Sequence, residues 1–151
     1  MKRRDFITTT LATAAIAALP KAANAANTQE GTTAMTTPAN RPASGYAPVN
    51  GVEVYYQIHG TGKPLVLLHG GLGAYEMFGP ILPMLTEKHQ VIGVDLQAHG
   101  RTRPFDRPMT HANMATDVAE LIKWLGYDKI DVVGYSMGAE VLMRVAIDHP
   151  E

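Results

Sequence analysis

The sequence contains no cysteine among its 151 residues. Disulfide bonds, thiolate metal sites and a cysteine nucleophile are therefore excluded. An excess of charge of one sign is also lacking, because 13 basic and 14 acidic residues nearly cancel, and no basic stripe marks a nucleic-acid-binding surface. No spacing of histidines and carboxylates suggests a metal site. We therefore expect no nucleic-acid partner and no bound metal.

The N-terminal apolar run is too short to cross a bilayer, which takes about 20 residues. This uncharged run, residues 6–19, follows the basic residues 2–4 and precedes the small residues 23–25. That order is typical of a secretory signal that is later removed. We expect residues 1–25 to be an export signal, with no stable membrane anchor after cleavage and a periplasmic location. A start at Met35 would instead make the protein cytoplasmic.

The next segment, residues 26–45, has almost no large apolar side chains and is rich in Thr, Ala, Pro and Asn. Such a segment cannot bury enough surface to offset the entropy lost on ordering. We expect it to be a flexible linker, with the folded domain in residues 46–151.

The first strands of the domain are predicted from a turn motif between them. Asn50-Gly51 lies between two short strand-like runs and predicts a β-hairpin, because both residues tolerate positive φ. The second strand should bury one face, formed by its alternating residues Val52, Val54, Tyr56 and Ile58. Residues 65–68, 91–96 and 130–135 are instead almost continuously apolar, as in parallel strands covered on both faces.

Between these strands the apolar residues follow helical spacing. Pro80 and Pro83 are tolerable only in the first turn of the first helix. Thr110 is a candidate N-terminal cap and Gly126 a candidate C-terminal cap for the second helix, and Pro150 ends the third. The three stripes are Met77, Phe78, Ile81, Leu82 and Leu85; Met114, Val118, Leu121 and Leu125; and Val141, Leu142 and Val145. This order predicts an α/β fold in which helices cover a mostly parallel sheet with an N-terminal hairpin.

The third parallel strand leads directly into Gly134-Tyr135-Ser136-Met137-Gly138, and a helix follows at once. G-x-S-x-G between a strand and a helix predicts a nucleophile elbow, a turn so sharp that side chains at the two glycines would clash. Ser136 is therefore the candidate nucleophile. Backbone N–H groups at the start of the next helix could stabilise negative charge beside it. The alternative is a serine that only caps a helix.

Two further motifs follow the other parallel strands, and the three together resemble the N-terminal half of the α/β-hydrolase superfamily, of the AB hydrolase-1 type. They are His69-Gly70-Gly71 with Phe78 nine residues after the histidine, and Asp95 with His99, Gly100, Arg101 and Thr102. The resemblance implies an α/β-hydrolase fold whose C-terminal half is absent from this chain.

The expected export signal also resembles a known sequence motif. Residues 3–7, Arg-Arg-Asp-Phe-Ile, resemble the twin-arginine export motif, in which two arginines are followed one residue later by Phe and an aliphatic residue. The resemblance implies export through the twin-arginine pathway.

The superfamily resemblance implies an esterase-like serine hydrolase that works by acyl transfer on a small molecule, an ester above all. Ser136 would attack a carbonyl, and the N–H groups of Met137 and Gly71 would hold the oxyanion, with Leu72 as the alternative second donor. A serine rather than an aspartate at the elbow disfavours the epoxide hydrolase and dehalogenase reactions of the same fold. A perhydrolase, a lyase, a carbon–carbon bond hydrolase, and a non-catalytic or vestigial binding module stay open. No cofactor is expected, because the Gly-rich stretches 60–64 and 71–76 match no nucleotide-binding motif.

A triad of this superfamily runs in the order serine, acid, histidine. The only histidine after Ser136 is His149, about 20 Å away along a helix. We therefore expect the acid and the base to be missing from this chain, which would be inactive by itself. A distorted arrangement with His69 or His99 is conceivable, but the expected role of both, and of Asp95, is to shape their loops.

Overall fold

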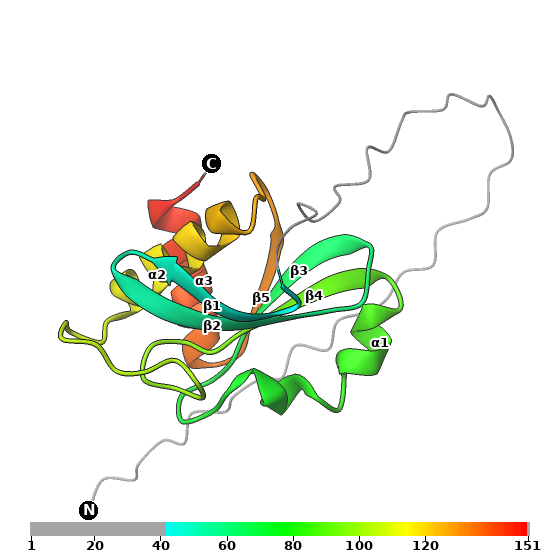
Figure 1. The fold of residues 1–151 in the computed structure, drawn as a ribbon, viewed down its shortest axis with the longest axis horizontal. Coiled ribbons are helices and arrows are strands. Elements are labelled where there is room, and N and C mark those ends of the chain that lie inside the picture. The colour runs from blue at the N-terminus through cyan, green and yellow to red at the C-terminus, as the bar shows by residue number, and fades with distance from the viewer. Residues whose placement is uncertain (1–41, 151) are drawn as a thin grey trace, which may run out of the picture. The chain divides into compact units, whose positions relative to one another are not determined.

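The computed structural model describes residues 42–150. In chain order the elements are β1 (Ser44–Val49), β2 (Val52–His59), β3 (Lys63–Leu68), the 3-10 helix η1 (Tyr75–Phe78), α1 (Leu82–Thr86), β4 (His89–Val94), α2 (His111–Trp124), β5 (Asp131–Gly134) and α3 (Met137–Asp148) (Figure 1). β1 thus begins inside the last two residues of the expected linker. The expected export signal and residues 26–41 of that linker lie outside the described residues. Between 42 and 150, none of the helices has the length and apolar character of a membrane span.

The five strands form one sheet in the order β1-β2-β4-β3-β5 (Figure 1). β3 is parallel to β4 on one side and to β5 on the other, whereas β2 is antiparallel to both β1 and β4. The expected class, an α/β fold with a mostly parallel sheet and an N-terminal hairpin, is confirmed. β5 is the last strand at its end of the sheet, and the side chain of Val133 on it is half exposed.

The hairpin turn has the backbone geometry that its sequence predicts. Asn50 and Gly51 have φ angles of 48° and 74°, and Val49 pairs directly with Val52 across the turn. Positive φ at both central residues is the geometry of a type I′ turn, whose twist matches that of the flanking strands.

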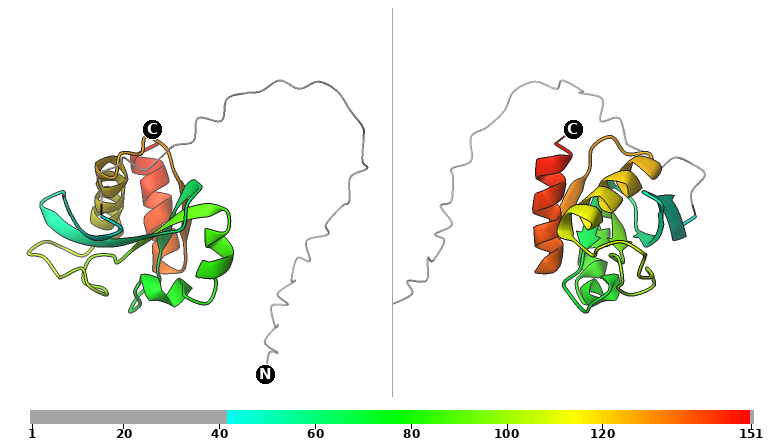
Figure 2. Two further views of the ribbon diagram at one scale, coloured as in Figure 1. Left: turned by 45° about the vertical axis from the view of Figure 1, so that its right-hand side comes forward. Right: turned by 90° about the vertical axis from the view of Figure 1, so that its left-hand side faces the viewer.

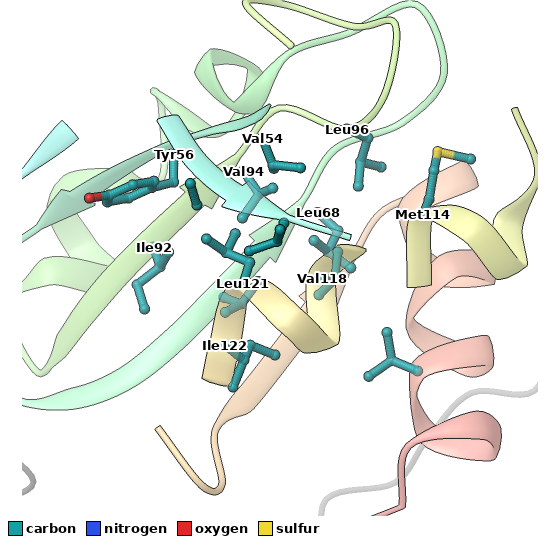
Figure 3. Packing of buried hydrophobic residues seen from close by; sticks show 14 of the residues in the cluster. Val54, Tyr56, Leu68, Ile92, Val94, Leu96, Met114, Val118, Leu121 and Ile122 are labelled. Atoms are coloured by element: carbon teal, nitrogen blue, oxygen red, sulfur yellow. The ribbon is translucent and has the colours of Figure 1, made fainter. Parts of the chain in front are cut away.

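Both faces of β3 and β4 are covered, which explains their continuous apolar runs, whereas β5 is partly exposed. Along β3, Val66 and Leu68 join the larger core under α2 and α3, whereas Leu65 and Leu67 join a smaller cluster with Phe78. α2 and α3 lie side by side (Figure 2). The larger core brings together residues of β2, β3, β4 and α2, including Val54, Tyr56, Leu68, Ile92, Val94, Val118, Leu121 and Ile122 (Figure 3).

The expected first helix is wrong, because the stripe from Met77 to Leu85 does not form one helix. It is divided into η1 and the short α1, with Gly79 and Pro80 between them. Pro80 cannot donate to a helical ladder, and its ring would meet the carbonyl of Glu76 if the helix continued. Bonds of the tighter i→i+3 type close this region instead, from Gly79 N–H to the Glu76 carbonyl and from Ile81 N–H to the Phe78 carbonyl, at 2.9 Å each.

The caps expected for α2 are confirmed. The Thr110 hydroxyl accepts a hydrogen bond of 3.1 Å from Asn113 N–H at the start of the helix. At the other end Gly126 has a φ of 88°, and Tyr127 N–H donates to the Ile122 carbonyl at 3.1 Å. This is the Schellman pattern, which satisfies carbonyl groups that the helix leaves free.

A buried polar network ties the hairpin to α2. Asp117, inside α2, accepts hydrogen bonds from the Arg107 guanidinium and, at 3.0 Å, from the Asn50 side chain. Arg107 also donates from Nε to the side-chain carbonyl of the buried Gln97, at 3.1 Å. The network therefore joins the β1–β2 turn, α2 and the loop after β4.

This network predicts unequal roles for two carboxylates on the same helix. Asp117→Ala leaves Arg107 largely buried without its partner, and we expect the free energy of unfolding to fall by about 3–5 kcal/mol. Glu120→Ala removes only an exposed pair with Lys123, and we expect a loss below about 1 kcal/mol. Urea unfolding of both variants measures the difference, and equal losses would contradict the role assigned to Asp117.

Candidate active site

The loops after the three parallel strands meet at one edge of the sheet, and each contains a strained residue. Within residues 42–150, the non-glycine residues with positive φ are Asn50, in the hairpin turn, and Leu72, Ala98 and Ser136, at 60°, 60° and 51°. Leu72 follows β3, Ala98 follows β4 and Ser136 follows β5. Unfavourable backbone conformations gather where the surrounding structure holds them for a function. This edge of the sheet is therefore the candidate site.

Ser136 occupies a turn between β5 and α3 in which there is no room for side chains at the neighbouring glycines. A Cβ atom at Gly138 would lie 2.2 Å from the Leu68 carbonyl oxygen, and one at Gly134 would lie 2.3 Å from the Gly138 carbonyl oxygen. The expected reason for glycine at both positions is confirmed. Because α3 starts this close to β3, the chain must reverse abruptly at Ser136, with a φ of 51° and a ψ of −119°.

The serine side chain is exposed and does not cap the helix. It makes no hydrogen bond to the N–H groups of α3, and its backbone is far from the extended conformation of ordinary capping serines. The alternative of a serine that only caps a helix is therefore contradicted. The side chain stands beside the start of α3, where helical N–H groups have no partner in the helix.

The loop after β3 lies against this turn. A Cβ atom at Gly70 would be 3.3 Å from Ser136 Cβ, and one at Gly71 would be 3.9 Å from Met137 Sδ. The structure thus brings together the three residues that the sequence singles out, Ser136, Gly71 and Met137. The N–H groups of Gly71, Leu72 and Met137 donate to no acceptor within residues 42–150. Gly71 and Leu72 are therefore both still open as the second donor.

His69 is buried beneath this loop and has both ring nitrogens in hydrogen bonds. Its Nε2 accepts from Leu96 N–H at 3.0 Å, which leaves the hydrogen on Nδ1, and Nδ1–H donates to the Gly70 carbonyl at 2.7 Å. Burial lowers the pKa of His69 below its ordinary value of 6.5, against the opposing effect of the hydrogen bond to Gly70. The imidazole is thus a neutral brace between two loops, as expected, and cannot accept a proton from Ser136.

Asp95 holds the loop after β4, as expected. Its carboxylate accepts from Tyr75 N–H at 2.9 Å and from Arg101 N–H at 2.8 Å. Its backbone carbonyl accepts from the Thr102 hydroxyl at 2.7 Å, and that hydroxyl accepts from Tyr55 N–H at 2.8 Å. Asp95 therefore links β4 to η1 and to its own loop.

Comparison with known proteins agrees with this arrangement. A model of the alpha/beta hydrolase fold matches residues 63–151, more than half of the chain. The chain belongs to the alpha/beta hydrolase fold family. The chain is 40% identical over 106 residues to a soluble epoxide hydrolase of Corynebacterium sp. (strain C12), covering 68% of this chain and 36% of the relative.

The chain is also similar to proteins whose names give other reactions. It is 36% identical over 105 residues to the sn-1-specific diacylglycerol lipase ABHD11 of Xenopus laevis, covering 66% of this chain and 33% of the lipase. The solved structure of the epoxide hydrolase CorEH superposes with a TM-score of 0.68 at 36% identity, over 71% of this chain and 38% of that one. The chain thus spans little more than a third of the length of these proteins.

The remaining histidines of the chain contact groups other than Ser136. His99 Nδ1 lies 2.8 Å from the Gln97 carbonyl, and His111 lies 3.1 Å from the carboxylate of Glu140. His149 follows α3, whose 12 residues span about 18 Å. His59 contacts the Gln57 side chain, and His89 contacts the Leu85 carbonyl. Within residues 42–150, no hydrogen bond joins the Ser136 side chain to a histidine or a carboxylate, and no three potential ligands gather as at a metal site.

Two contributors to the site were missed by sequence reasoning. The sulfur of Met77, expected to face a helix core, instead accepts a hydrogen bond of 3.4 Å from Gly70 N–H and so supports the loop beside Ser136. The buried Gln97 binds His99 through its carbonyl and Arg107 through its side chain. Only the position of Gln97, two residues after Asp95 in a motif loop, could have pointed to it.

The close packing at the nucleophile elbow predicts that one methyl group added at Gly138 strongly destabilises the fold. Gly138→Ala places a Cβ atom against the Leu68 carbonyl, and we expect a loss of about 2–3 kcal/mol in the free energy of unfolding because β3 and α3 must separate. Gly71→Ala is the matched control, since its Cβ atom would meet nothing closer than 3.9 Å. Thermal and urea unfolding test this, and an unaffected Gly138→Ala variant would refute the close packing.

The buried His69 predicts that the free energy of unfolding depends on pH. Its lowered pKa means that below about pH 6.5 the unfolded chain binds a proton that the folded chain does not, so stability is full above pH 6.5 and falls as the pH drops through the lowered pKa. His69→Asn keeps a donor for the Gly70 carbonyl but does not titrate. We expect this variant to show a smaller loss of stability between about pH 6.5 and 5. Urea unfolding across that range checks it, and identical slopes would contradict the assignment.

Proposed function

We propose that this chain carries the nucleophile and the oxyanion site of a serine hydrolase that transfers the acyl group of a small ester. The observation that supports it best is the strained Ser136, exposed between two sets of free N–H groups, those of Met137 and of the Gly71–Leu72 turn. An exposed hydroxyl and free donors on adjacent elements are the parts that acyl transfer needs.

Each part has a defined task in this proposal. The Ser136 oxygen attacks the ester carbonyl, and the negative charge that develops on the carbonyl oxygen is held by Met137 N–H and Gly71 N–H. Donors fixed in advance in this way are worth about 3–4 kcal/mol each in the transition state. The alcohol leaves, an acyl ester remains on Ser136, and water releases the acid.

The similarity to an epoxide hydrolase suggests a second reaction, and the chemistry of Ser136 argues against it. If a serine oxygen opened an epoxide, the product would be an ether on the enzyme, which water does not cleave. Attack on a carbonyl leaves an ester, which water cleaves once a base activates it. The serine therefore favours carbonyl substrates, as do the names of relatives such as the diacylglycerol lipase.

No base for Ser136 is assigned among residues 42–150. Both nitrogens of His69 are engaged, His149 lies at the far end of α3, and within residues 42–150 no histidine forms a hydrogen bond with Ser136. We expect the 151-residue chain alone to show little or no turnover, and the activity proposed is that of the whole protein. A perhydrolase, a lyase or a carbon–carbon hydrolase would use the same serine and donors.

Labelling of the nucleophile tests this function. The sequence holds only two serines, Ser136 and Ser44, the second exposed at the start of β1. We expect a fluorophosphonate probe to modify the protein expressed from its natural gene, at Ser136 only, and to inhibit its hydrolysis of p-nitrophenyl esters. Ser136→Ala should abolish both signals, and Ser44→Ala should leave both unchanged.

Three other results would contradict the proposal. Absence of labelling would favour a non-catalytic module, and retained esterase activity in Ser136→Ala would exclude Ser136 as the nucleophile. Turnover of an epoxide such as styrene oxide, lost in Ser136→Ala, would overturn the preference for carbonyl substrates. Mass spectrometry of the modified peptide identifies the serine.

A further inference from the structure

Leu72 combines two unfavourable features at the centre of the candidate site. Gly73 N–H donates to the Gly70 carbonyl at 3.2 Å, which closes a tight turn with Leu72 as its third residue. Leu72 has a φ of 60° there, a conformation that favours glycine or asparagine at this position. Its side chain is fully exposed. A leucine is thus held in a strained backbone while its apolar surface remains in water.

The side chains around this turn are also apolar. Tyr135 is half exposed, and its ring would be 2.9 Å from a Cβ atom at Gly70. Met77 Sδ would be 3.6 Å from a Cβ atom at Gly73, and Met137 lies beside Gly71. We call the exposed set Leu72, Met77 and Tyr135 the apolar rim. Surfaces of this kind mark places where a ligand or partner binds.

The charged side chains near the apolar rim do not offer a site for a charged ligand. Glu76, next to Met77, pairs with the Arg101 guanidinium. Arg101 lies over the ring of Tyr55, 4.7 Å from its centroid, and also contacts Asp95. Since these charges are paired with one another, a long aliphatic group fits the apolar rim better than a carboxylate or an ammonium group does.

We propose that Leu72 and the apolar rim bind the aliphatic acyl chain of the substrate, so that the site prefers medium-chain acyl esters to acetyl esters. This inference rests on the proposed function, because it assumes that the substrate carbonyl lies between Ser136 and Gly71. The same turn then performs two tasks: Gly71 N–H meets the oxyanion, and the next side chain covers the acyl chain. The strained φ of Leu72 turns its side chain out of the loop to where that chain lies.

The test compares two esters on the protein expressed from its natural gene. We expect Leu72→Gly to lower kcat/KM for p-nitrophenyl octanoate about tenfold, because the apolar contact is lost, and to change kcat/KM for p-nitrophenyl acetate less than about twofold. Leu72→Asn, which also accepts a φ near 60°, should show the same split. Met84→Ala removes an exposed apolar side chain of α1 that is not part of the apolar rim, and it should leave kcat/KM for both esters unchanged.

The possible outcomes separate this inference from the function on which it rests. If a fluorophosphonate fails to label Ser136, both are overturned. If Ser136 is labelled and the octanoate-to-acetate ratio of Leu72→Gly equals that of the unmodified protein, only the role of Leu72 is overturned. An equal loss on both esters also overturns it, since Leu72 would then support the loop and not the acyl chain.

Discussion

The close contact between the first turn of α3 and β3 is the constraint on which the site depends. Gly138 approaches the Leu68 carbonyl so closely that a methyl group does not fit, and this contact forces the reversal at Ser136. The same contact brings the start of α3 next to the loop that leaves β3, so Gly71 lies beside Met137. One backbone contact thus positions both the proposed nucleophile and its proposed donors, before any side chain other than the serine is specified.

The polar groups around this contact hold the loops instead of reacting. His69 bridges Gly70 and Leu96, and Asp95 bridges Tyr75 and Arg101, so each buried side chain joins two of the elements at the sheet edge. A buried polar group is stabilising only when its hydrogen bonds are made, and here they are made to backbone groups that the loops would otherwise leave unpaired. Such braces limit the cost of keeping Ser136 in a strained conformation.

Local signals made most of this fold predictable from sequence. The turn Asn50-Gly51, the caps Thr110 and Gly126 and the strand–elbow–helix motif each fix a short stretch through nearby atoms, and all four occur where predicted. Apolar spacing alone failed between Met77 and Leu85, because Pro80 interrupts the helical ladder there. Pro83, by contrast, lies in the first turn of α1, where a proline is tolerated as expected. The positions of Ser136, Gly71 and Met137 followed from motifs, whereas the contacts of Gln97 and Met77 form within loops whose irregular conformation is not predicted by residue spacing. The φ of Leu72 is also set by the turn and not by residue type.

The proposed acyl transfer needs two parts of different origin. The proposed nucleophile and oxyanion donors are placed by backbone geometry at the ends of neighbouring strands, where β3, β5 and α3 pack. A base must instead be a side chain aimed at Ser136, and the histidines nearest this edge have ring nitrogens committed to the loops, both of them in His69 and Nδ1 in His99. The first part already restricts the reaction, because a serine oxygen gives a cleavable intermediate only from a carbonyl group. With Ser136 in its proposed role, the identity of the attacking atom limits the substrate class more strongly than the similarity of the whole chain to any one relative does.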